Sequence, residues 1–524
     1  MSSDIRDIDL FVIGGGVNGA GIARDAAGRG LSVVLCEKDD LAQGTSSRSG
    51  KLVHGGLRYL EHYEFRLVRE ALIEREVLLE SAPHIIWPMR FVLPHSPLDR
   101  PAWLIRLGLF LYDHLGGRGK LPGTRVLDLS SAPEGAPLKA AYTRGFEYSD
   151  CWVDDARLVL LNALDAHERG ATVLTRTRCT RARRESGRWR VETHDARTGR
   201  TATFRARAIV NAGGPWVSDI IGEVTGSNDA RRIRMVKGSH LIVPKFWDGP
   251  QAYLVQNDDK RVIFINPYEG DKALIGTTDI PYAGEQEKVV ADEEEIRYLI
   301  RAVNRYFDTP LKREDVLETF SGIRPLLDDE AENPSAVTRD YTFDLDRGGA
   351  ARAGAGGQGE ADAPMLSVFG GKITTFRKLA EHALERLEPF FPDMKPAWTR
   401  HGPLPGGDMP GADFEAFLAR LLADRPWLPE GLGLHYARLY GTRTDALLGS
   451  AGSLDDLGRH FGSQLHEIEA NYLREHEWAM TAEDVLWRRT KHGLRLSEAE
   501  RDAFGRWFRP DLALSARSSV RHHA

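Results

Sequence analysis

Residues 10–19 read LFVIGGGVNG, a short apolar run that ends in glycines. Such a run is typical of a buried parallel strand. The segment 17–29 is rich in Ala and apolar residues and predicts a helix, which Gly30 stops. Residues 32–36 predict the next strand. The start of the chain therefore predicts a β-α-β unit that begins almost at residue 1.

The glycines of this unit match the dinucleotide fingerprint G-x-G-x-x-G. Gly14 permits a tight turn, Gly16 lets the backbone approach a pyrophosphate, and Gly19 lets helix and strand pack closely. The N-terminus of the helix offers free N–H groups and a positive dipole end to the phosphates. Glu37 ends the second strand and can accept hydrogen bonds from a ribose without a 2′-phosphate. The alternative is a glycine turn without a ligand.

The fingerprint alone does not distinguish FAD from NAD, but three features favour FAD. The motif lies at the very N-terminus, and a hydroxyl-rich stretch at 43–52 can bind a second phosphate or the flavin. Glycine-containing strand ends recur at 211–216 and 369–375. The latter places Lys372 at a helix start, where positive charge stabilises a reduced, anionic flavin.

Composition excludes several classes of protein. The 524 residues include 70 Lys and Arg against 76 Asp and Glu, a net charge of −6 that argues against a general nucleic-acid binder. Cys36, Cys151 and Cys179 lie far apart, which disfavours a disulfide scaffold and a Cys-type zinc site; no metal is predicted. The N-terminus lacks a secretory pattern, and no run approaches the ~18 apolar residues of a membrane span. We expect a cytoplasmic protein, with any membrane association peripheral.

The pattern of strand-like and helical segments along the chain indicates interleaved domains followed by a helical domain. Strand-like segments recur between residues 171 and 276, which indicates a separate sheet, and the stretch 401–408, rich in Pro and Gly, is typical of a linker. We predict FAD-binding segments at about 7–75, 150–225 and 360–395, substrate-binding segments at about 76–149 and 226–359, and a C-terminal helical domain at 401–524.

Several longer strings carry a family resemblance. The most specific is HGGLRYL at 54–60. Others are TSS at 45–47, GFEYSDCWVDD at 145–155, KGSH at 237–240, IGTTD at 275–279, SGIRP at 321–325 and SVFGGKITT at 367–375. With these, nearly the whole chain resembles the FAD-dependent, quinone-linked sn-glycerol-3-phosphate dehydrogenases of the aerobic bacterial type. It departs at Gly50, where that pattern has serine, and at Gly213, where it has threonine.

The resemblance implies a mixed α/β fold. A Rossmann-like FAD-binding domain would join an antiparallel-sheet substrate domain, as in flavoproteins like glutathione reductase and D-amino-acid oxidase, with an all-helical C-terminal domain. The implied reaction is oxidation of glycerol 3-phosphate at C2 to dihydroxyacetone phosphate by hydride transfer to N5 of FAD. Electrons would pass to a membrane quinone. A homodimer attached peripherally to the inner face of the cytoplasmic membrane is also implied.

The resemblance also implies the residues of the site. The cofactor residues would be Gly14, Gly15, Gly16, Asn18, Gly19, Glu37, Thr45, Ser46, Ser47, Lys51, Leu52, Cys179, Gly213, Gly370, Gly371 and Thr374. Arginine suits bidentate phosphate binding. The phosphate and glycerol hydroxyls are therefore assigned to Arg58, Tyr59, Thr277 and Arg339.

The chemical step needs a proton acceptor and a stabilised alkoxide. His240 is the candidate base because the ordinary pKa of histidine lies near 6.5. Arg324 and Lys372 would stabilise the alkoxide and the reduced flavin, and a proton-accepting role for one of them stays open. Three alternatives also stay open: a structural role for His240, an ion pair of Arg339 with a neighbouring aspartate, and a covalent flavin link at His54, for which a supporting role is preferred.

Two segments suit a bilayer surface. Residues 101–113 are apolar with Trp and Tyr near their ends, and residues 487–492 are basic with a Trp. The alternatives are a buried core helix for the first and a solvated helix face for the second.

Three other functions compete with the quinone-linked dehydrogenase. A soluble glycerophosphate oxidase would use the same site but pass electrons to oxygen and form peroxide. An amine- or amino-acid-oxidising flavoenzyme of the same fold would need no phosphate site. A non-catalytic dinucleotide sensor would not need the set of Arg, His and Lys candidates.

Overall fold

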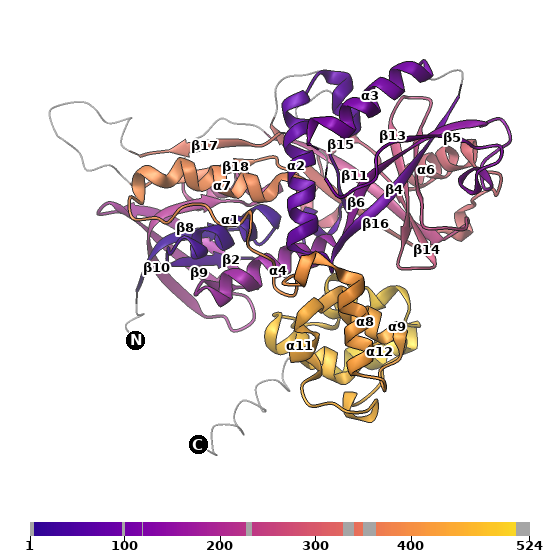
Figure 1. The fold of residues 1–524 in the computed structure, drawn as a ribbon. Helices are drawn as coiled ribbons and strands as arrows, with labels where there is room; N and C mark the ends of the chain where they lie inside the picture. The colour runs from indigo at the N-terminus through magenta and orange to yellow at the C-terminus, as the bar shows by residue number, and fades with distance from the viewer. Residues whose placement is uncertain are drawn as a thin grey trace.

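The computed structural model describes residues 5–96, 100–117, 119–226, 233–327, 340–348 and 363–509. These residues form a mixed α/β fold with two sheets and a separate group of helices (Figure 1). The mixed architecture predicted from the sequence is confirmed. Arg339, most of the loop 348–363 and part of the basic stretch 231–234 lie outside the described residues.

The first sheet contains the predicted β-α-β unit. Strand β1 (Arg6–Ile13) is followed by helix α1 (Val17–Gly28) and strand β2 (Val33–Cys36). Strand β1 lies parallel to β2 and, on its other side, to β10 (Thr201–Asn211), which lies parallel to β18 (Met365–Phe369). The sheet order is β17-β18-β10-β1-β2-β7, with β17 at Thr342–Asp346 and β7 at Thr172–Leu174. Segments far apart in the sequence therefore complete this sheet.

Helices cover the first sheet. Helix α1 packs between α4 (Asp155–Glu168) and α7 (Phe376–Leu387), and their apolar side chains share one core with β1, β2 and β10. On the opposite face lie β8 (Thr177–Glu185) and β9 (Arg188–Asp195), an antiparallel pair attached to β10. The carboxyl ends of β1, β10 and β18 meet at one edge, where α/β sheets bind ligands.

The second sheet is mostly antiparallel and stands beside the first (Figure 1). Its central order is β11 (Ile233–Pro244), β14 (Lys272–Gly276), β13 (Val262–Tyr268), β12 (Ala252–Gln256), β4 (Ile86–His95) and β6 (Arg144–Val153), with β16 (Glu318–Leu327) paired to β11. Helix α6 (Glu293–Tyr306) packs on one face through Ile296, Leu299 and Val303. Helices α2 (Phe65–Ser81) and α3 (Ala102–Leu115) pack on another part of the sheet.

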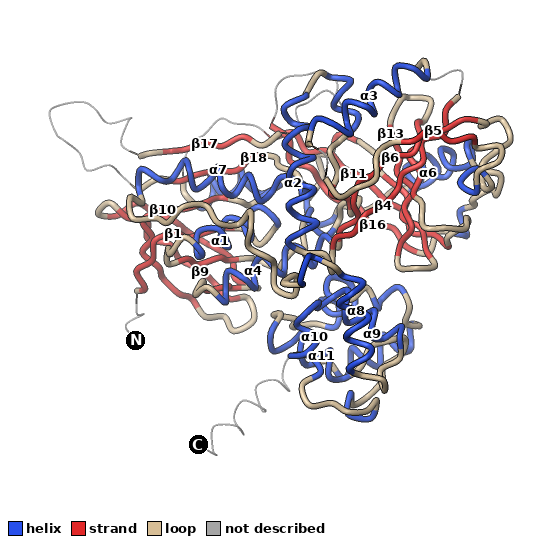
Figure 2. Tube along the Cα trace, in the orientation of Figure 1, coloured by secondary structure: helices blue, strands red, loops and turns tan. Residues whose placement is uncertain are grey.

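The described part of the chain after residue 401 contains helices and no strand (Figure 2). They include α9 (Glu430–Tyr440), α11 (Glu467–His476) and α12 (Glu498–Trp507), which share a separate apolar core, and α8 (Phe414–Asp424), which packs in a smaller cluster against α9. In Figure 1 this orange-to-yellow group lies below α2 and α4.

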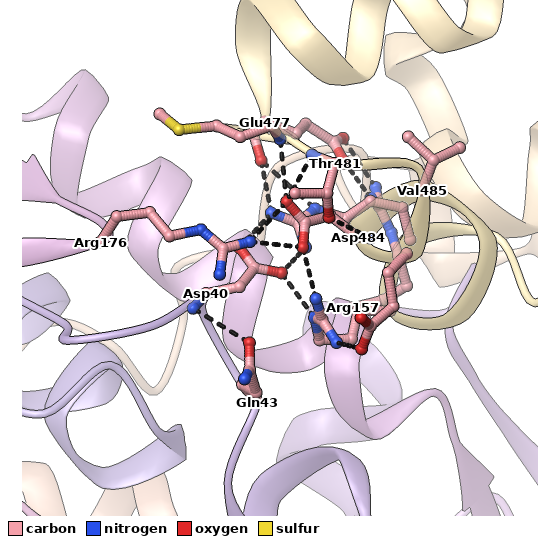
Figure 3. A network of polar contacts seen from close by, with 12 residues as sticks. Asp40, Gln43, Arg157, Arg176, Glu477, Thr481, Asp484 and Val485 are labelled. Carbon is pink, nitrogen blue, oxygen red and sulfur yellow. Dashed lines mark hydrogen bonds and ion pairs between the residues drawn. The ribbon is translucent and has the colours of Figure 1, made fainter. Parts of the chain in front are cut away.

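A buried network of ion pairs joins the helical group to the first sheet (Figure 3). Asp40, in the loop after β2, binds Arg488 at 2.6 Å and Arg489 at 2.9 Å. Arg176 binds Asp484 at 2.7 Å, and Arg157 of α4 makes a two-pronged ion pair with Glu477. Asp40 and Arg489 are each about 1% exposed.

This network changes the interpretation of residues 487–492. Arg488, Arg489, Thr490, Lys491 and His492 are buried. Neither a bilayer contact nor a solvated helix face, the two roles that the sequence suggested, fits residues that lie inside the molecule. Their charges are instead neutralised by Asp40, Asp484 and Asp154.

Candidate active site

A cavity of about 610 Å³ lies between the two sheets. The turn after β1, the loop 36–54, the turn after β10 and the turn after β18 line one part of it, and the inner faces of β11, β13, β14 and β16 line the other. The predicted site residues in its wall are Gly14, Gly15, Gly16, Asn18, Glu37, Thr45, Ser46, Leu52, Tyr59, Cys179, Gly213, His240, Thr277, Arg324, Gly370, Gly371, Lys372 and Thr374.

At one end of the cavity the glycine turn has no room for side chains. Gly14 has a φ of +111°, which favours glycine, and a Cβ there would lie 2.5 Å from the carbonyl oxygen of Ala212. A Cβ at Gly19 would lie 1.9 Å from the carbonyl oxygen of Gly14. Gly19 therefore does not line the cavity but allows α1 to approach the turn, as predicted from its place in the fingerprint.

Helix α1 presents its N-terminus to the cavity. Its N-cap residue, Gly16, has no side chain that could cap the helix, and no acidic residue lies in its first turn. The N–H of Val17 donates to Ser46 Oγ at 3.0 Å, and Asn18 Nδ2 donates to the carbonyl of Gly370 at 3.1 Å. These bonds hold the loop 43–52 and the turn after β18 against a helix end that favours an anion.

Glu37 lies at the same end of the cavity, at the end of β2. Its carboxylate accepts the N–H of Gly15 at 2.7 Å and of Asp39 at 2.9 Å. Burial raises the pKa of Glu37, although both backbone bonds oppose that shift. A glycine cradle, a helix N-terminus and a half-buried carboxylate in one cavity that continues to Lys372 fit an extended dinucleotide such as the predicted FAD.

The other part of the cavity wall contains two cationic side chains, Arg324 and Lys372. Arg324 on β16 donates to Asp279 Oδ1 at 2.8 Å and to Thr277 Oγ1 at 3.2 Å. A Cβ at Gly238 would lie 2.5 Å from Arg324 Nη2, so glycine makes room for the guanidinium. Lys372 Nζ lies 3.7 Å from the centre of the Tyr59 ring. The wall here carries positive charge and hydroxyls, which suit an anionic, hydroxylated ligand.

His240 on β11 lies in the same wall, 3% exposed. Its ring stacks on Phe320 with 4.8 Å between centres, and a Cβ at Gly276 would lie 2.1 Å from His240 Cδ2. Burial, with the charges of Arg324 and Lys51, lowers the pKa of His240 to about 3. The imidazole is therefore neutral at pH 7 and available as a hydrogen-bond acceptor, while the same shift makes it a weaker base.

Several predicted residues lie away from the cavity wall. Lys51 is buried and binds Asp155 at 2.7 Å and the carbonyl of Ser47 at 3.2 Å, which indicates a structural role for both Lys51 and Ser47 in the loop. Arg58 is half-buried and does not line the cavity. Its phosphate-binding role, like that of Arg339 outside the described residues, stays a prediction.

The structure also places residues in the wall that were not predicted as site residues from the sequence. Arg48 donates to the carbonyl of Ser321 at 3.2 Å, and its position inside the hydroxyl-rich loop was the only available signal. Asn266 on β13 had no such signal, because only the pairing of β13 with its neighbours turns it toward the cavity.

One group of side chains elsewhere has the composition of a metal site. In the helical group, His435, Glu469 and His492 offer ligand atoms within 4.8 Å of one another. Glu469 already accepts hydrogen bonds from His435 at 2.7 Å and Tyr440 at 2.8 Å. These bonds account for the cluster as a buried polar network.

The glycine cradle gives a direct prediction. Changing Gly19 to Ala should weaken FAD binding at least tenfold, about 1.4 kcal/mol, because the new Cβ overlaps the carbonyl of Gly14 and pushes α1 away. The ratio of flavin to protein absorbance after purification, with titration of FAD into the apoprotein, measures it. Gly108→Ala is the control, since a Cβ there meets nothing within 4 Å. Unchanged FAD affinity in Gly19→Ala would contradict the assigned packing role.

Comparisons with known proteins identify the family of this chain. The family model described as FAD dependent oxidoreductase matches residues 9–366, and that described as the C-terminal domain of alpha-glycerophosphate oxidase matches 397–506. The chain is 68% identical to D-erythritol 1-phosphate dehydrogenase of Brucella abortus over 95% of this chain and 97% of that one. It is 53% identical to aerobic glycerol-3-phosphate dehydrogenase of Escherichia coli, with the same shares covered.

A solved structure agrees as well. The glycerol-3-phosphate dehydrogenase from Bacillus halodurans complexed with FAD superposes with a TM-score of 0.73 at 27% identity, covering 96% of this chain and 94% of that one.

Proposed function

The chain belongs to the FAD dependent oxidoreductases, among the relatives of the glycerol-3-phosphate dehydrogenases, and from this we propose that it oxidises the secondary alcohol next to a phosphomethyl group. The substrate proposed first is sn-glycerol 3-phosphate, with dihydroxyacetone phosphate as the product. One observation carries the proposal: the neutral His240 and the cations Arg324 and Lys372 line the same cavity as the glycine cradle.

FAD is the cofactor, held by the turn at Gly14–Gly16, the N-terminus of α1, Glu37 and the loop 43–52. When bound, it supplies the acceptor for a hydride, at N5, from the carbinol carbon. The protein's own residues handle the charge and the proton. His240 accepts the hydroxyl proton or its hydrogen bond, and Arg324, held by Asp279, stabilises the negative charge that develops on the oxygen. The carbon–oxygen bond becomes a carbonyl as the hydride and the proton leave.

The phosphate needs a cationic partner that the described site supplies only in part. Lys372 and Arg324 lie in the cavity, whereas Arg58 does not line it. We keep Arg58, Tyr59, Thr277 and Arg339 as the proposed phosphate and hydroxyl ligands. Replacement of a true phosphate ligand raises KM for the phosphorylated substrate while it leaves flavin content unchanged.

A membrane quinone is the proposed electron acceptor, reached from the inner face of the cytoplasmic membrane. Helix α3 supports a peripheral contact, because Trp103, Leu107 and Phe110 are 68%, 47% and 56% exposed. Their spacing places them on one face of the helix, as in helices that lie in a bilayer interface. Within the described ranges, no helix is both long and apolar enough to cross a bilayer. The core-helix alternative fits only Leu109 and Tyr112, which are buried.

The contact of α3 with lipid can be tested directly. Changing Trp103, Leu107 and Phe110 together to Ser should reduce sedimentation with vesicles of anionic phospholipid at least fivefold and leave reduction of the flavin by substrate unchanged. The same triple change at the exposed Val126, Val290 and Leu317 is the control. Equal loss of vesicle binding in both variants would remove α3 as the contact.

The homodimer that the resemblance implies is part of the proposal, and light scattering tests it.

The decisive experiment is anaerobic addition of glycerol 3-phosphate to the purified holoenzyme. Loss of the visible flavin absorbance supports the proposed reaction. Subsequent reoxidation that is faster with a quinone analogue than with oxygen favours a dehydrogenase, whereas fast reoxidation by oxygen with stoichiometric peroxide identifies the oxidase. An unchanged spectrum with polyol phosphates, together with bleaching by amines or amino acids, would replace the proposal by the amine-oxidising alternative.

D-Erythritol 1-phosphate is a second candidate substrate, favoured by one observation. The D-erythritol 1-phosphate dehydrogenase of Brucella abortus is 68% identical to this chain, whereas the glycerol-3-phosphate dehydrogenase of Escherichia coli is 53% identical over a similar length. Both compounds carry a secondary alcohol beside a phosphomethyl group, so one catalytic arrangement serves both. The anaerobic titration is therefore run with each.

A further inference from the structure

The wall of the cavity contains a polar side chain that the reaction as described does not use. Asn266 lies on β13 and is 1% exposed. Pairing of β13 with β14 sets Phe264 opposite Gly276, and pairing of β11 with β14 sets His240 opposite the same glycine. Asn266, two residues further along β13, therefore lies on the same face of the sheet as Phe264 and His240. All three line the cavity.

The orientation of the Asn266 amide follows from its neighbour. Asn266 Nδ2 donates a long hydrogen bond of 3.4 Å to the carbonyl oxygen of Gly50. Only the NH₂ end of an amide can donate to a carbonyl oxygen, so this contact assigns the nitrogen to the side of Gly50. The acceptor atom Oδ1 consequently faces away from Gly50. Oδ1 is buried and accepts no hydrogen bond from any described residue. Buried acceptors are normally satisfied, so an unsatisfied one in a ligand cavity marks a place for a donor that arrives with the ligand.

Gly50 lies beside both Asn266 and His240. A Cβ built on Gly50 would lie 3.6 Å from His240 Nε2, while the carbonyl of the same residue meets Asn266. Gly50 therefore lies close to both the candidate proton acceptor and the unsatisfied amide. Asn266 pairs with Leu274 and His240 with Gly276, so a ligand hydroxyl that reaches Asn266 lies two residues along the sheet from His240.

We propose that Asn266 Oδ1, beside Gly50, forms a subsite for an additional hydroxyl of a polyol phosphate longer than glycerol phosphate. The class that fits is a four-carbon polyol monophosphate, whose terminal hydroxyl donates to Asn266 while its carbinol lies at His240. The chemistry is unchanged: the carbinol C–H leaves as hydride to FAD, the O–H proton leaves toward the base, and a ketone forms. This inference rests on the proposed function of the same cavity.

Leu274 offers a matched control beside the subsite. It pairs with Asn266 across β13 and β14 and lines the same cavity, but it carries no polar atom. A change from Leu274 to Val alters the apolar volume of the wall without touching the proposed hydrogen bond. It therefore separates the loss of a hydroxyl acceptor from a general disturbance of the sheet.

The test compares kcat/KM for D-erythritol 1-phosphate and for glycerol 3-phosphate in wild type, Asn266→Leu and Leu274→Val holoenzymes. We expect wild type to prefer the four-carbon substrate at least tenfold. Asn266→Leu should lose at least tenfold on that substrate and less than threefold on glycerol 3-phosphate, and Leu274→Val should change both alike.

The outcomes separate this inference from the proposed function. Equal losses on both substrates in Asn266→Leu, or a wild-type preference for glycerol 3-phosphate, would overturn the subsite while the proposed oxidation stands. Failure of both polyol phosphates to bleach the wild-type flavin would overturn the proposed function itself. Flavin content and the thermal midpoint of each variant identify a folding defect. If Asn266→Leu loses its flavin, Asn266→Ser, which keeps a small polar group, takes its place in the same comparison.

Discussion

Replacing Arg324 with Ala should lower kcat/KM for the polyol phosphate substrate by a factor of roughly 10²–10³, the loss typical of removing one group that stabilises a developing oxyanion. Its guanidinium lines the cavity and is held in place by Asp279 and Thr277. Positive charge fixed in this way needs no reorganisation when the alkoxide forms. The rate of anaerobic flavin reduction in a stopped-flow experiment measures the effect on the chemical step directly.

The same variant should move the pH profile. Burial is the largest cause of the lowered pKa of His240, and the charge of Arg324 is the next. Removing that charge raises the pKa of the imidazole toward its ordinary value, so protonation blocks the acceptor at a higher pH. The acidic limb of the flavin-reduction rate should therefore shift upward in pH. A profile identical to that of wild type would show that His240 does not accept the proton.

Arg313→Ala is the matched control for this experiment. Arg313 pairs with Glu293 at 2.8 Å, but both side chains are more than half exposed and lie outside the cavity wall. We expect flavin reduction in this variant to remain within twofold of wild type at every pH. A comparable loss in both variants would attribute the effect of Arg324→Ala to lost global charge and not to its place in the cavity.

Changing Asp40 to Asn should destabilise the holoenzyme by about 3–5 kcal/mol, the usual result of removing one partner of a buried ion pair. Arg488 and Arg489 would keep their charges inside the molecule without the carboxylate that now binds both. Asp40 also lies between Asp39 and Ala42, which line the cavity, so FAD affinity should fall as well. Thermal unfolding and FAD titration measure the two effects.

The control for Asp40 is a surface ion pair of the same type. Asp445 binds Arg425 at 2.6 Å, but its carboxylate is 72% exposed. Asp445→Asn should therefore change stability by about 0–1 kcal/mol and leave FAD binding unaltered. A small effect of Asp40→Asn, similar to that of the control, would mean that water enters the junction and that the helical group is only loosely attached.

Much of the fold could be predicted because its signals are local. The apolar run 10–13, the glycines after it and the stop at Gly30 each describe a few neighbouring residues, and the structure has β1 and α1 there. Residues 487–492 show where local reasoning failed. A Trp beside basic residues looks like an interfacial segment, but Arg488 meets Asp40, 448 positions away, and Lys491 meets Asp154, 337 positions away.

The residues of the candidate site could likewise be predicted only in part. His240, Arg324 and Lys372 were chosen from separate motifs, and the structure brings all three to one cavity. Arg58 and Tyr59 are adjacent in the most specific motif, yet only Tyr59 lines that cavity, since neighbouring side chains point in different directions. The role inferred for Asn266 depends on strand register and on the carbonyl of Gly50, neither of which the sequence displays.

The order of strands in the first sheet bears on how the protein is made. Strand β10 pairs with β1 on one side and with β18 on the other, so the nucleotide-binding sheet lacks a strand until residue 369 has left the ribosome. The ion pair between Asp40 and Arg489 can form only after residue 489 has been synthesised. Contacts of such long sequence separation slow folding. We expect the nascent chain to acquire its flavin only after synthesis is nearly complete, and C-terminal truncations before residue 489 to accumulate without bound flavin.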